Sequence, residues 1–169
     1  MRVTNIHSRT YPVSSDKIGA LVDTLSSTND LLWPHKLWPR MKFDKPLSLS
    51  ANGGHGPIRY FVEEYVTGKR IVFHFTGPNG FDGFHGYDVV ELENNKTELR
   101  ETLKMKTHGM ARLSWPLIFC PLHDALIEDS LSFAELRLNL TPTVSEWTLW
   151  VKFLRWLISG GKSRAQTIV

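Results

Sequence analysis

Glu101 is the residue of this chain whose surroundings most favour chemistry. The stretch 97–108 alternates between polar and apolar residues, which predicts a β-strand. The face that carries Glu101 also carries Leu99, Leu103 and Met105. If that face is buried, desolvation would raise the pKa of the Glu101 carboxyl and suit it to proton transfer. The alternative is a glutamate near a strand end that reaches solvent or pairs with an arginine.

His123 is the second candidate, because it lies with Asp124 near the start of the longest predicted helix. It could face a cavity and hydrogen-bond a ligand, whereas Asp124 suits a helix N-terminus for structural reasons alone. Glu128 and Asp129 follow one turn later and are typical of a solvated helix face. Glu101 and His123 are therefore the candidate catalytic groups, and whether any reaction occurs stays open.

Other reactive residue types are placed less favourably. The seven histidines include no His-Glu-x-x-His or similar close spacing, so we predict no metal and no cofactor, although three could converge in space. Cys120 lies between Phe119 and Pro121, an apolar setting that raises the pKa of a thiol and keeps it unreactive. The sequence contains no Gly-x-Ser-x-Gly, which excludes a hydrolase nucleophile elbow.

Aromatic side chains are spread over the predicted strands and the helix lead-in. Most of them are ordinary core residues on the simplest interpretation, and the rest would line a pocket for a ring-bearing or acyl ligand. The predicted ligand-binding residues are Trp38, Tyr60, Phe73, Phe75, Phe84, Tyr87, Leu103, Trp115, Phe119 and His123.

The elements that must position these residues are an antiparallel sheet and one long helix. Strands are predicted at 3–11, weakly at 47–51, and at 58–65, 70–76, 82–93 and 97–108. A helix is predicted after Ser14, followed by an irregular lid that contains two Leu-Trp-Pro runs. The glycines of 52–57 indicate a tight turn, because no Lys-Ser/Thr pair follows to form a phosphate loop.

The stretch Trp115–Leu138 has the longest helical spacing in the chain. Its apolar arc is broad, which is typical of a helix that the sheet embraces on more than one side. Pro116 and Pro121 predict that the regular helix begins near Pro121, after a bent lead-in from Met110.

Three local runs and the order of elements carry a resemblance to a known superfamily. The runs are GGHGPIRY at 53–60, WPL at 115–117 and PLHDALIED at 121–129. With the element order of residues 1–140, they resemble uncharacterised bacterial members of the START-like (SRPBCC, polyketide cyclase/dehydrase-like) superfamily. The resemblance implies an α+β helix-grip fold, in which a curved antiparallel sheet wraps around a long C-terminal helix. Members hold lipids, sterols, polyketides or hormones in the intervening cavity, and no shared catalytic signature identifies a catalytic residue here.

Residues 141–169 extend beyond this domain of residues 1–140 as a predicted amphipathic helix and tail. Thr143 and Glu146 have capping-box spacing, which predicts that the helix begins there. The segment 143–158 combines three tryptophans with Lys152 and Arg155. This composition is compatible with packing on the domain, with a homodimer contact, or with peripheral membrane contact.

The bulk composition bounds the function class. The chain has 169 residues and a net charge of +3 without a dense basic run, so we expect one core and no nucleic-acid partner. The single cysteine and the absence of an apolar signal-like start favour a cytoplasmic protein.

Three functional hypotheses follow. The first is a carrier or sensor that binds a small hydrophobic molecule, such as a lipid, polyketide or aromatic compound, in an internal cavity. The second is a cyclase/dehydrase-like enzyme that uses Glu101 or His123 for acid-base chemistry. The third is a membrane-associating or dimerising accessory protein that acts through residues 143–158.

Overall fold

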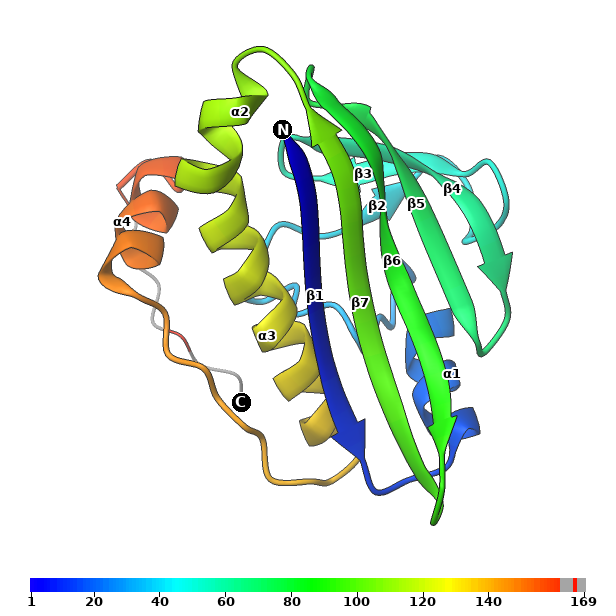
Figure 1. Ribbon diagram of the computed structural model, residues 1–169. Helices are drawn as coiled ribbons and strands as arrows, with labels where there is room; N and C mark the ends of the chain where they lie inside the picture. Colours follow the sequence, from blue (N-terminus) through cyan, green and yellow to red (C-terminus); the bar gives the residue numbers. More distant parts are fainter. Residues whose placement is uncertain (162–165, 167–169) are drawn as a thin grey trace.

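The computed structural model describes residues 1–161 and Gln166. Its architecture is a curved antiparallel sheet that partly surrounds one long helix (Figure 1). In chain order the elements are β1 (Arg2–Tyr11), α1 (Ser15–Asp23), β2 (Lys42–Phe43), β3 (Asn52–His55), β4 (Ile58–Val66), β5 (Arg70–Gly77), β6 (Phe81–Leu92), β7 (Lys96–Thr107), α2 (Ala111–Ser114), η1 (Trp115–Phe119), α3 (Cys120–Arg137) and α4 (Leu149–Ile158). The predicted α+β class and helix-grip arrangement are confirmed.

The sheet has seven strands in the order β1-β7-β6-β5-β4-β3-β2, so the first strand pairs with the last. The alternation that predicted these strands is also what orients them, since successive side chains point to opposite faces. Along β7, the residues that share a face with Glu101 are buried, and the intervening Lys104 and Lys106 are exposed. The concave face of the sheet is therefore apolar apart from a few buried polar groups.

Helix α1 packs against the turn between β4 and β5 at very short range. A Cβ atom added at Gly19 would lie 2.3 Å from the carbonyl oxygen of Gly68. The Asp23 carboxylate also accepts hydrogen bonds from the backbone N–H of Gly68 and the hydroxyl of Tyr65, both at 2.9 Å. The turn is thus fixed to the helix at both of these points.

The region before β4 differs from the prediction. Residues 47–51 form no strand, and most of the predicted glycine turn is instead strand β3, which pairs with β2. The reason is steric, because a Cβ atom at Gly53 would lie 2.0 Å from the carbonyl oxygen of Lys42. Here the glycines allow two backbones to approach closely, which composition alone did not distinguish from turn formation.

The regular helix α3 begins at Cys120, next to Pro121 as predicted. Its lead-in is helical from Ala111 onwards, and the π-helical segment η1 with Pro116 joins α2 directly to α3. Pro121 has no N–H to donate to the carbonyl of Leu117, four residues earlier. The indole Nε1 of Trp150 on α4 donates to that carbonyl instead, at 2.7 Å.

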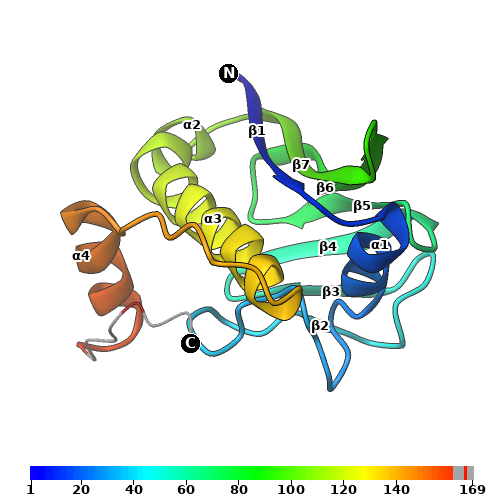
Figure 2. The ribbon, with the colours of Figure 1, turned by 90° about the horizontal axis from the view of Figure 1, so that it is seen from below.

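Helix α4 lies against α3 on the side away from the sheet, as Figure 2 shows. The predicted capping box is wrong, because 139–148 is not helical and the hydroxyl of Thr148 caps α4 by accepting from the backbone N–H of Val151. Thr143 instead donates its backbone N–H to Glu135 of α3, at 2.6 Å. The last part of the predicted tail, 162–165 and 167–169, lies outside the described residues.

Candidate ligand-binding site

A partly open cavity of about 590 Å³ lies between the sheet, the long helix and the lid that contains Leu37 and Trp38. This volume is in the range that takes a small organic molecule. Its wall is mainly apolar, and its aromatic members are Trp38, Phe75, Phe81, Trp115 and Phe119. The polar side chains that reach it include three imidazoles, those of His55, His85 and His123.

Six of the ten predicted ligand-binding residues line this cavity. They are Trp38, Phe75, Leu103, Trp115, Phe119 and His123. Tyr60, Phe73 and Tyr87 do not line it and pack within the hydrophobic core instead. Phe84 is a correction, since it pairs across the sheet with the exposed Lys104 and therefore belongs to the outer face.

His55 and His85 also line the cavity, and the sequence analysis did not select them. His85 could have been found, since it lies two residues from the inward Tyr87 on a strand whose side chains alternate. His55 gave no such signal, because its segment was interpreted as a turn rather than as strand β3.

Glu101 lies behind the cavity wall and is shared by two of the imidazoles. Its side chain is completely buried, and its Oε1 lies 3.4 Å from Nε2 of His123 and 3.7 Å from Nδ1 of His85. Burial alone would raise the pKa of Glu101, as expected from the sequence. The positive charge of His123 and contacts with both imidazoles outweigh burial and hold the pKa below its usual range.

The two imidazoles differ in charge state although they share one carboxylate. Burial opposes the charged form of His123, but the carboxylates of Glu101 and Asp124 raise its pKa to about 9. For His85 burial dominates over the attraction of Glu101, so its pKa is lowered. At neutral pH the Glu101 carboxylate therefore has one imidazolium, His123, and one neutral imidazole, His85, beside it.

These polar groups are incompletely satisfied by the described residues. No hydrogen-bond partner reaches Nε2 of His85, either oxygen of Glu101, or either nitrogen of His123. The imidazole nitrogens of His123 and His85 lie 3.4 and 3.7 Å from Oε1 of Glu101, which are distances of ion pairs rather than of short hydrogen bonds. Buried polar groups are nearly always hydrogen-bonded in proteins, so this cluster retains hydrogen-bonding capacity beyond its ion pairs.

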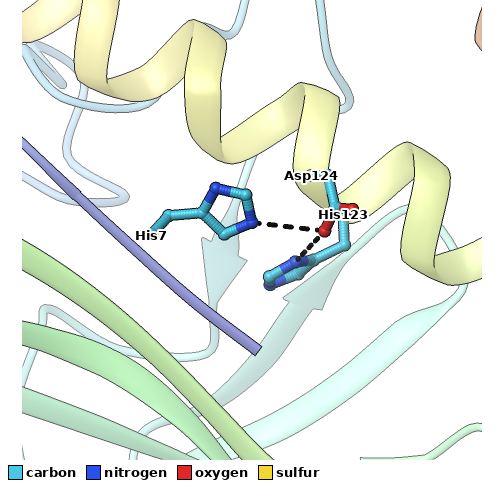
Figure 3. Close-up of side chains that lie close together, drawn as sticks. All are labelled: His7, His123 and Asp124. Carbon is cyan, nitrogen blue, oxygen red and sulfur yellow. Dashed lines mark hydrogen bonds and ion pairs between the residues drawn. The ribbon is translucent and has the colours of Figure 1, made fainter. Parts of the chain in front are cut away.

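A second cluster joins His123 to the edge of the sheet. Figure 3 shows His7 of β1 and His123 of α3 directed at the same carboxylate, that of Asp124. Asp124 Oδ1 lies 3.2 Å from Nε2 of His7 and 3.6 Å from Nδ1 of His123. Hydrogen bonds to Asp124 and Glu128 raise the pKa of His7 to about 9.

Oppositely charged side chains also face one another further along the contact between β1 and α3. Arg9 contacts Glu128 at 2.8 Å and Glu135 at 3.0 Å, so bases on the strand face acids on the helix. His7, His123 and Asp124 could each offer one ligand atom to a divalent metal, since these atoms lie within 4.8 Å of one another. In the structure the same atoms are paired with each other, and the cluster fixes α3 against the edge strand.

Comparison with known proteins identifies the fold class. No protein-family model matches the chain, and no curated protein matches its sequence. Solved helix-grip structures do match it over most of its length. The chain is thus similar to proteins in which a curved sheet grips a long helix.

Three of these structures illustrate the similarity. A Thermobifida fusca protein solved by NMR is 17% identical with a TM-score of 0.62, over 84% of this chain and 99% of its own. Norcoclaurine synthase from Thalictrum flavum, in complex with dopamine and hydroxybenzaldehyde, is 13% identical with a TM-score of 0.61, over 85% and 90%. CalU16 from Micromonospora echinospora is 14% identical with a TM-score of 0.58, over 94% and 87%. Identities this low establish a shared fold and no shared activity.

Proposed function

We propose that this protein binds a small, mostly apolar, ring-bearing molecule with one polar group in the cavity between the sheet and α3, as a carrier or sensor. The observation that carries the proposal is the contrast within the cavity. An aromatic wall ends at imidazoles of His85 and His123 whose nitrogens have unmet hydrogen-bonding capacity. A polar group on the ligand would satisfy them, while the rings of the ligand would replace water against the wall.

The volume of the cavity, about 590 Å³, is large enough for a molecule of two or three rings. Norcoclaurine synthase, which shares the fold, is named as a complex with dopamine and hydroxybenzaldehyde, two ring-bearing molecules with hydroxyl groups. That likeness supports only the capacity of the fold to hold such molecules. The preference of this chain rests on its own lining residues.

The first test uses 2-naphthol, which has two rings and one hydroxyl group, with naphthalene as the ligand that lacks the hydroxyl. We expect 2-naphthol to bind more tightly, by about ten-fold or more in Kd, since an unmet buried polar group costs over 1 kcal/mol. Leu122→Trp would narrow the cavity and weaken 2-naphthol binding, whereas Leu92→Trp at the exposed end of β6 would not. Equal binding by both variants would overturn the proposal.

Native mass spectrometry of freshly purified protein extends this test to the natural ligand. We expect a retained small molecule in the wild-type protein and less of it in Leu122→Trp. The exact mass of that molecule would then define the ligand class.

An enzyme of the cyclase/dehydrase kind is the second candidate, because one protonated and one neutral imidazole share a carboxylate. His123 could donate a proton and His85 could accept one, which is what acid-base catalysis requires. The test compares Glu101→Gln and His123→Ala with the retained molecule as substrate, followed by mass change. Lost turnover with unchanged affinity would favour an enzyme, and weakened binding without any turnover would favour a carrier.

A further inference from the structure

An exposed apolar surface lies on the far side of the long helix from the sheet. We call the exposed apolar side chains of 110–118 and 149–158 the apolar face. On the helix lead-in, Met110, Leu113 and Leu117 are between 57% and 75% exposed. Large apolar side chains exposed together in this way mark an interaction surface more often than scattered ones do.

Helix α4 contributes an aromatic row to the same face. The rings of Trp150 and Phe153 stack at 5.4 Å, and those of Phe153 and Trp156 stack at 6.1 Å, with each side chain almost half exposed. The hydrogen bond from Trp150 to the carbonyl of Leu117 joins this row to the helix lead-in. Figures 1 and 2 both show α4 beside the start of the long helix.

The charged residues within the two segments that form the apolar face have one sign. Neither 110–122 nor 147–161 contains an aspartate or glutamate, whereas both carry exposed cations, Arg112 and Lys152. Two copies joined symmetrically through this face would bring these cations together without an acidic partner, which disfavours a homodimer. An anionic lipid surface complements the same charges, and tryptophan is enriched at the level of lipid headgroups.

The apolar face is continuous with the opening of the cavity. Ile118 and Ile158 belong to the face, and both also line the cavity. An apolar molecule that leaves the cavity here would enter a lipid surface without crossing water. The release of such a molecule into lipid rests on the proposed function, whereas docking of the protein on a lipid surface does not.

We propose that the apolar face docks this protein on the surface of an anionic membrane. The contact is peripheral, because none of the helices in 1–161 combines the length and apolarity needed to cross a bilayer. Helix α4, with ten residues, spans about 15 Å, half of the hydrocarbon thickness of about 30 Å. It would lie in the plane of the interface with its aromatic row inserted.

The test is co-sedimentation of the full chain with vesicles of phosphatidylcholine, alone or mixed equally with phosphatidylglycerol. We expect binding to the mixed vesicles, a blue shift of tryptophan emission, and a decrease in binding as salt is raised. Leu113→Asp should reduce binding about ten-fold or more, because a charge would enter the interface. Leu49→Asp is the matched control, since Leu49 is 57% exposed and Leu113 59%, and Leu49 lies in the loop before β3.

Arg112→Glu with Lys152→Glu tests the charge argument on its own. This double variant should lose the preference for phosphatidylglycerol and retain the fold, as judged by circular dichroism. Absence of wild-type binding to either vesicle would overturn the proposal. So would a dimer that Leu113→Asp dissociates in light scattering, without vesicle binding. The affinity of Leu113→Asp for 2-naphthol is measured in parallel. If that affinity is unchanged, a failure of membrane docking leaves the proposed binding of a ligand in the cavity intact.

Discussion

At the scale of single residues, the cavity depends on imidazoles held in different charge states. His55 is the clearest case, since burial lowers its pKa to about 3, aided by the nearby positive charge of His123. Its Nδ1 lies 3.0 Å from the hydroxyl of Tyr60, and its ring packs on Trp33 at 4.7 Å. The folded protein therefore keeps His55 neutral where an unfolded chain would protonate it.

His55 should make the folded protein sensitive to mild acid. Its folded pKa lies below its unfolded value of about 6.5, so its contribution is complete above that pH and is lost as pH falls towards 3. Each pH unit in this window removes at most about 1.4 kcal/mol. We expect the unfolding free energy of His55→Phe, measured by urea titration, to lose about 1–2 kcal/mol less than wild type between pH 7 and pH 5.

The difference between the two proteins isolates His55, because the other titrating groups are common to both. His7 and His123, with raised pKa values, act in the opposite direction and cancel in that difference. Identical pH dependence of the two proteins would show that His55 is protonated in the folded state.

The candidate site was only partly predictable at this scale. Alternation along 97–108 predicted the face of Glu101, and that face is buried. The rise in its pKa was not borne out, because the histidines that oppose it come from β6 and α3, far away in the sequence. His7 gave no signal either, since its partners Asp124 and Glu128 lie more than one hundred residues away.

At the scale of elements, close backbone contacts decide where helix α1 lies. Gly19→Ala would force a methyl group towards the carbonyl of Gly68, at 2.3 Å, and the helix or the turn would have to move. We expect a loss of about 1–3 kcal/mol in the free energy of unfolding, the usual cost of overpacking. Chemical denaturation measures this loss.

Lys17→Ala in the same helix is the matched control, because Lys17 is exposed and should change stability by less than about 0.5 kcal/mol. Alanine is also the better helix former, by about 1 kcal/mol relative to glycine. A stabilised Gly19→Ala protein would therefore mean that α1 is free to shift away from the turn.

Elements with strong alternation or helical spacing were predictable, and those set by tertiary contact were not. The four long strands 58–108 and the long helix follow from local patterns. Strands β2 and β3 depend on glycines that admit a neighbouring backbone, and the non-helical segment before α4 is held by the hydrogen bond from Thr143 to Glu135 of α3. Neither contact leaves a trace in local sequence.

At the scale of the whole molecule, the lid, α3 and α4 meet at one buried carboxylate. Asp129 Oδ2 accepts hydrogen bonds from the indoles of Trp38, at 2.7 Å, and Trp147, at 2.9 Å. The guanidinium of Arg155 on α4 stacks over both rings, at 4.1 and 4.0 Å. Trp38 also lines the cavity. The contacts of Trp38 with Asp129 and Arg155 therefore connect the wall of the cavity to α4, which carries part of the apolar face.

Asp129→Asn tests whether this junction unites the molecule. The amide oxygen can replace Oδ2 and accept from both indoles, but the amide N–H groups then replace Oδ1 and face Nε2 of Gln166, which donates to Oδ1 at 2.8 Å. Because two donors then meet and the negative charge is lost, we expect a loss of about 1–3 kcal/mol of stability. Tryptophan fluorescence and far-UV circular dichroism should report one coincident transition, because Trp147, Val151 and Leu154 belong to the buried core. Asp82→Asn, at a side chain 64% exposed, should leave the midpoint unchanged. Separate transitions by the two probes, with an early fluorescence change, would mean that α4 detaches as an independent unit.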